Sequence, residues 1–142
     1  MTQTALSPKE TKEVTDICME YFRKETKSEE KAKKLMADLA TLIQQPAAKL
    51  VHLGNLVFLI LVKEKGVIEF HTMGEEKTSD AYTKDMKALA KYLYKIGAHK
   101  IYSYTDDPKF GILAKRSRMG WTTSETTGED GKKYTVYTLE KK

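Results

Sequence analysis

The stretch that decides the fold runs from Leu50 to Met73 and reads LVHLGNLVFLILVKEKGVIEFHTM. It holds three apolar runs separated by two turn signals, Gly54-Asn55 and Lys65-Gly66. The middle run, Leu56–Val62, is apolar throughout, which is typical of a central strand, whereas Val67–Met73 alternates in the manner of a strand with two different faces. The stretch therefore predicts an antiparallel meander of three strands.

The segment after the meander alternates helix and strand. The apolar residues Met86, Leu89 and Leu93 recur at helical spacing, and Gly97 follows as a stop signal. We expect a long helix capped by Thr78, Ser79 or Asp80, a strand over Ile101–Tyr104, a short basic helix over Phe110–Met119 stopped by Gly120, and a terminal hairpin formed by Trp121–Thr127 and Lys132–Leu139.

Two amphipathic helices are expected before the meander. The first begins at Ser7-Pro8, where a capping residue precedes a proline suited to the first helical turn. The second begins near Ser28 and ends at Gln45-Pro46. A first strand over Thr2–Leu6 stays an open alternative. The expected order is helix, helix, three strands, helix, strand, helix and two strands.

Length and composition narrow the classes of protein. The chain has 142 residues, of which 40% are hydrophobic and 32% charged, so we expect one domain with a real core. Cys18 is the single cysteine, which excludes an internal disulfide and argues against a cysteine zinc site. No apolar run approaches the length of a membrane span, and no secretion signal follows Met1. We therefore expect a cytoplasmic protein without a metal site and without membrane contact.

The order of elements resembles the GNAT superfamily of acyl-CoA-dependent N-acyltransferases, over about Leu50–Leu139. The best local matches are Ile96–Ile101, which looks like the helix end before the family's fifth strand, and Ala114–Trp121, which is similar to its short helix ending in Gly-Phe. The resemblance implies an α/β (α+β) fold with a mixed, mainly antiparallel sheet of about six strands flanked by about four helices. It implies a single domain, residues 1–142, with a helix pair over 7–45 and the sheet over 48–140.

The resemblance also implies a cofactor, acetyl-CoA, and a transfer of its acyl group to an unknown amine. The family holds the cofactor pyrophosphate with an Arg/Gln-x-x-Gly-x-Gly/Ala loop at the start of its long helix. The corresponding stretch here is Lys77–Tyr82, in which Asp80 and Tyr82 fill the glycine positions. The resemblance assigns cofactor binding to Lys77, Thr78, Ser79 and Ala81, together with Arg116, which stands where many members carry a tyrosine acid.

The general base of the family projects from the strand that corresponds to Val67–Met73. Glu69 and His71 share one face of this strand, so the resemblance implies that one of them takes the proton of the incoming amine. The alternative is that both decorate a solvated sheet face.

Two other functions stay open. The segment from Lys109 to Arg118 is basic, and Pro108–Ser124 contains no acidic residue, so this helix could bind nucleic acid through phosphate contacts. The chain also looks like short phage-encoded proteins of acyltransferase type, some of them virion-associated. That resemblance implies a non-catalytic interaction protein in a host cytoplasm.

Overall fold

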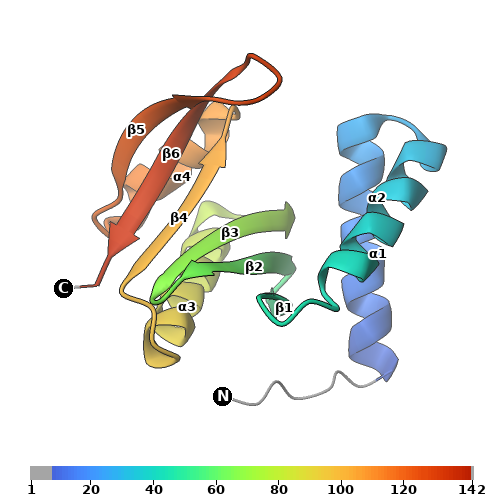
Figure 1. Ribbon diagram of the computed structural model, residues 1–142, viewed down its shortest axis with the longest axis horizontal. Helices are drawn as coiled ribbons and strands as arrows, with labels where there is room; N and C mark the ends of the chain where they lie inside the picture. The colour runs from blue at the N-terminus through green and yellow to red at the C-terminus, as the bar shows by residue number, and fades with distance from the viewer. Residues whose placement is uncertain (1–7, 142) are drawn as a thin grey trace.

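The computed structural model describes residues 8–141, with side chains from residue 11 onward (Figure 1). Its elements are α1 (Pro8–Thr26), α2 (Glu29–Leu42), β1 (Ala48–Leu53), β2 (Leu56–Glu64), β3 (Val67–Gly74), α3 (Ser79–Lys95), β4 (Lys100–Thr105), α4 (Pro108–Ser117), β5 (Thr122–Thr127) and β6 (Lys133–Glu140). The predicted order of four helices and six strands is confirmed. The proposed strand over Thr2–Leu6 and the proposed cap at Ser7 lie outside the described residues.

The six strands form one sheet in the order β1-β2-β3-β4-β6-β5. All neighbouring strands are antiparallel except β3 and β4, which are parallel. The parallel pair requires a crossover, and α3 provides it. The sheet is therefore mixed and mostly antiparallel, as predicted.

The two faces of the sheet carry separate cores. Phe58, Ile60 and Phe70 point to the α3 side, where they pack with Leu89 and Leu93 of that helix. The opposite face packs on α1 and α2 through residues that include Val14, Cys18, Leu39, Val57 and Met73. Figure 1 shows this helix pair beside the β1–β3 part of the sheet, and within residues 8–141 no helix packs on the β4-β6-β5 part of the same face. Polar side chains of β3 and β4 come together at the border of this uncovered part.

Two helix ends differ from the prediction. The helix α2 ends at Leu42 rather than at Pro46, because the chain leaves the helix in tight turns in which Gln44 and Gln45 donate to Thr41 and Leu42. The helical conformation is disfavoured at the residue before a proline, here Gln45, so the helix ends before this residue. The helix α4 ends at Ser117 rather than at Met119, because Arg118 takes a left-handed conformation with φ 54°.

Candidate active site

The parallel strands β3 and β4 pair over only part of their length. Their register joins Val67–Glu69 to Lys100–Tyr102, and both strands continue beyond this point without pairing to each other. The site lies where the strands part. On the uncovered face, the ring of His71 on β3 meets the ring of Tyr104 on β4 edge to face, with the ring centroids 5.2 Å apart.

Glu69 and His71 form a hydrogen-bonded pair at this point. The distance from His71 Nε2 to Glu69 Oε2 is 2.6 Å, and the hydroxyl of Tyr102 donates to Glu69 Oε1 at 3.0 Å. Glu69 is only 8% exposed, whereas the His71 side chain is 31% exposed. When Glu69 is ionised, both of its oxygens accept hydrogen bonds, and His71 Nε2 carries the donated proton. The remaining ring nitrogen, Nδ1, has no hydrogen-bond partner among the described residues.

The tyrosines around this pair stay protonated at neutral pH. Burial, together with the hydrogen bond to Glu69, raises the pKa of Tyr102 to about 12. Burial raises the pKa of Tyr104 as well, with the charges of Glu69 and Glu129 adding to the effect. Tyr102 is therefore a permanent donor to Glu69. Sequence reasoning missed this role, because it depends on the register that places Tyr102 opposite Glu69.

The residues assigned to a cofactor lie at the start of α3 and on α4. Thr78 caps α3, and its Oγ1 accepts from the amide of Ala81 at 3.1 Å. Arg116 of α4 reaches the same turn, with its Nη1 3.4 Å from Ser79 Oγ. Lys77 is exposed immediately before the cap. The fold thus places Lys77, Ser79 and Arg116 at the start of α3. Thr78 and Ala81 are hydrogen-bonded to each other in the cap of this helix.

Aromatic side chains fill the space between α3, α4 and the sheet. Tyr82 packs edge to face on Phe110, with ring centroids 6.4 Å apart, and Trp121 lies between Phe110 and Phe70 at 6.2 and 6.0 Å. Burial raises the pKa of Tyr82 to about 12. The tyrosine at the second glycine position of the family loop is therefore a packed residue of this aromatic cluster.

The other residues singled out from the sequence have structural positions. Cys18 is fully buried, and burial raises the pKa of its thiol to about 11, which makes it a packed residue rather than a nucleophile.

Within residues 11–141, no group of three histidine, cysteine or acidic side chains is arranged to hold a metal ion. None of the helices described is long and apolar enough to cross a membrane.

Comparison with solved structures finds acetyltransferases of similar fold. No protein-family model and no curated protein sequence matches the chain. A point mutant of the spermidine N-acetyltransferase from Vibrio cholerae superposes with a TM-score of 0.65 at 13% identity, over 99% of this chain and 95% of that one. An aminoglycoside 6'-acetyltransferase of type Ii gives a TM-score of 0.65 at 13% identity, over 99% and 97%. A Salmonella typhimurium protein of the acetyltransferase class, solved with its cofactor acetyl-CoA, gives 0.54 at 12% identity, over 77% and 73%.

Proposed function

From the premise that this chain has the GNAT N-acetyltransferase fold, we propose that it transfers an acetyl group from acetyl-CoA to a cationic amine, with His71 as the general base. The observation that supports the proposal is the Glu69–His71 pair, which lies at the point where β3 and β4 part and on the strand for which the family resemblance implies a base. A buried carboxylate that holds one ring nitrogen of a histidine leaves the other nitrogen free to accept a proton.

The start of α3 is suited to the phosphates of the cofactor. The amides of Ser79 and Asp80 belong to the first helical turn and have no intrahelical acceptor, and Lys77 and Arg116 bring two positive charges to them. The carboxylate of Asp80 opposes this arrangement through charge repulsion. We assign phosphate binding to Lys77, Ser79 and Arg116, with the Thr78–Ala81 cap fixing the helix turn that carries them.

The chain's own residues then act on the acceptor. When bound, acetyl-CoA would supply an activated acetyl thioester, whose C–S bond is exchanged for a C–N bond to the amine while CoA leaves as the thiol with the second proton of the nitrogen. His71 Nδ1 takes the proton that the amine must lose to become a nucleophile, and Glu69 stabilises the imidazolium that results. Tyr102 holds Glu69 in place from the other side at 3.0 Å. The edge of Tyr104 against the His71 ring limits how far the imidazole can turn.

The charges around the site favour a cationic acceptor. Glu69 accepts a hydrogen bond from Tyr102 at 3.0 Å and Asp130 accepts one from Tyr134 at 2.6 Å, and the charges of Glu129 and Asp106 also raise the pKa values of Tyr104 and Tyr134. The exposed ring of Tyr104 offers a cation–π contact to an ammonium group. Spermidine, the substrate in the name of one structural neighbour, is therefore a first acceptor to try.

The test is a transfer assay with acetyl-CoA and a panel of polyamines and lysine peptides. His71→Asn and Glu69→Gln are each expected to lower kcat by about 10²–10⁴-fold, the range for loss of a general base or of its partner. His99→Asn is the matched control, because His99 is exposed at the turn before β4. Full turnover in a folded His71→Asn variant would reject the assignment of the base.

A further inference from the structure

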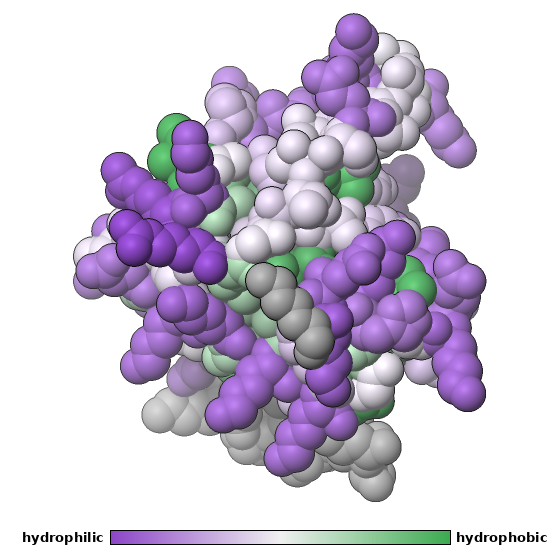
Figure 2. Space-filling model, turned by 90° about the vertical axis from the view of Figure 1, so that its left-hand side faces the viewer, coloured by the Kyte–Doolittle hydropathy of each residue, from purple (hydrophilic) through white to green (hydrophobic). Residues whose placement is uncertain are grey.

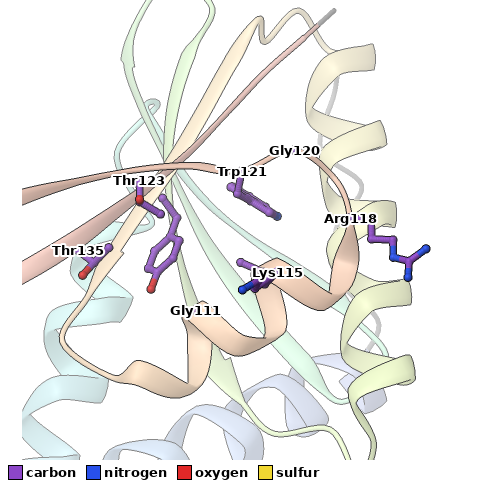
Figure 3. Close-up of a pocket in the computed structure, with 9 residues that line it drawn as sticks. Gly111, Lys115, Arg118, Gly120, Trp121, Thr123 and Thr135 are labelled. Atoms are coloured by element: carbon purple, nitrogen blue, oxygen red, sulfur yellow. The ribbon is translucent and has the colours of Figure 1, made fainter.

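A cavity lies beside α4, and none of the residues assigned to the cofactor lines it. Its volume is about 620 Å³, and it opens between α4 and the β5–β6 hairpin (Figure 3). This volume is in the range of small-molecule sites, which run from about 300 to 1,000 Å³. The residues that line it come from α4, the turn after it and both strands of the hairpin: Gly111, Ala114, Lys115, Arg118, Gly120, Trp121, Thr123, Thr135 and Tyr137.

The cavity is built by the sequence rather than left by loose packing. A Cβ on Gly111 would lie 2.7 Å from Tyr137 Oη, so only glycine lets α4 approach that hydroxyl so closely. Gly120 turns the chain from α4 into β5 with φ 93°. Strand β5 is exposed along its whole length, whereas Phe110 of α4 packs on Tyr137 of β6. The gap between the helix and the outer strand is the cavity.

One wall of the cavity is aromatic and rigid. Trp121 is held by Phe70 and Phe110, and the ring of Tyr137 lies 4.7 Å from that of Phe110. Tyr137 is buried, with 6% exposure. Fixed rings of this kind provide a flat surface against which a planar ligand can stack at low entropic cost.

The polar groups of the cavity favour an anion. No acidic residue lines it, whereas Lys115 places its side chain over the cavity in Figure 3. The Arg118 guanidinium points away from the cavity in the same view. The hydroxyls of Thr123 and Thr135 lie on the opposite wall. Lys115 and the two hydroxyls are donors of the kind that bind a carboxylate or phosphate. Glu125, which pairs with Thr135 across the hairpin, borders this wall.

This cavity is separate from the proposed cofactor residues. Arg116, the neighbour of Lys115 in sequence, faces the other way and contacts Ser79 of α3. Successive residues of a helix point in directions about 100° apart, so Lys115 and Arg116 serve two different surfaces. Figure 2 views the molecule from the hairpin side and shows a pale band of intermediate hydropathy bordered by hydrophilic side chains.

We infer that the cavity between α4 and the β5–β6 hairpin binds a small molecule that combines an aromatic ring with one carboxylate or phosphate group. The ring stacks on Trp121, the partly exposed member of the aromatic wall, and the anionic group contacts Lys115, Thr123 and Thr135. Of the basic segment Lys109–Arg118, this site uses Lys115. It does not depend on the acyl transfer proposed above.

Amide-resolved NMR of the whole chain tests the site. The probes are adenosine 5'-monophosphate and indole-3-acetate, with adenosine, indole and inorganic phosphate as the matched controls. We expect saturable shifts at Gly111, Gly120 and Thr123 with the two anionic aromatic probes, and none with the neutral compounds or with phosphate. If only one of the two probes binds, the result supports the site and identifies the anionic group that it prefers.

Two lysine variants make the test specific. Lys115→Gln is expected to weaken probe binding about tenfold or more, which is the loss of one charge-assisted contact. Lys109→Gln removes the same charge from the first turn of α4, outside the cavity, and is expected to leave binding unchanged. Equal weakening by both variants, equal binding of inorganic phosphate, shifts confined to Ser79 and Asp80, or no saturable shift would each overturn the inference. None of these readouts involves acetyl transfer, so failure here is distinguishable from failure of the proposed function.

Discussion

Replacing Asp85 by asparagine is expected to stabilise the protein above pH 7 and to change its stability little near pH 4. Asp85 is 8% exposed, and its Oδ2 is buried without a hydrogen-bond partner. The carboxyl of Glu76 lies against it, and two carboxyl groups can form a hydrogen bond only if they share a proton. Burial, with the contact to Glu76, raises the pKa of Asp85 to about 7.

The sign of the pH dependence follows from this shift. Between about pH 4 and pH 7 the unfolded chain has lost the Asp85 proton while the folded chain still holds it, so the free energy of unfolding falls as pH rises. The difference between the ordinary pKa of 3.8 and about 7 is about 3 pH units. At about 1.36 kcal/mol per unit this gives a ceiling of about 4 kcal/mol. Because Asp85 and Glu76 titrate as a pair, part of this shift belongs to Glu76, and the expected loss lies below this ceiling.

The assay is urea unfolding of the wild type and of Asp85→Asn at a series of pH values from 4 to 8. The asparagine amide donates to Glu76 at every pH, so the stability difference between the two proteins should open between about pH 4 and pH 7 and stay constant above. Asp38→Asn, at an exposed aspartate of α2, is the control. A difference that is constant across this range, or a variant that is less stable at pH 8, would refute the shared proton.

Three other substitutions test separate parts of the structure. Tyr102→Phe removes the donor to Glu69, and we expect a shifted pH profile of kcat with a largely unchanged KM for acetyl-CoA, because Tyr102 acts through Glu69. A changed KM with an unshifted profile would argue for a substrate contact instead. Asp80→Asn removes the negative charge from the first turn of α3 and should tighten acetyl-CoA binding in calorimetry, most strongly at low salt; weaker binding would contradict the phosphate assignment. Ser28→Ala removes the cap of α2 and should lower the free energy of unfolding by about 1 kcal/mol in chemical denaturation, while Ser28→Asn should retain most of it.

Local patterns predicted most of the elements, because burial and turn chemistry act over a few residues. The apolar run Leu56–Val62 is a central strand, and the turn at Lys65-Gly66 joins it to β3. The end of α4 could not be predicted, because the left-handed Arg118 is a conformation that a non-glycine residue rarely adopts. The parting of β3 and β4 is likewise set by contacts distant in sequence.

The candidate site was predictable only in part. Glu69 and His71 are two residues apart on one strand, so alternation alone places them on one face. The bond from Tyr102 to Glu69 spans two strands joined by a long crossover, and no local signal indicates that register. The carboxyl pair of Glu76 and Asp85 arises in the same way, from a loop and a helix that the fold brings together.

The most direct test of the proposed acyl transfer is calorimetry with acetyl-CoA on the wild type, Arg116→Gln and Lys115→Gln. The two variants change neighbouring residues that face different surfaces. The proposal predicts saturable micromolar binding that Arg116→Gln weakens and Lys115→Gln leaves unchanged. An absence of binding at millimolar acetyl-CoA, or equal weakening by the two variants, would contradict it.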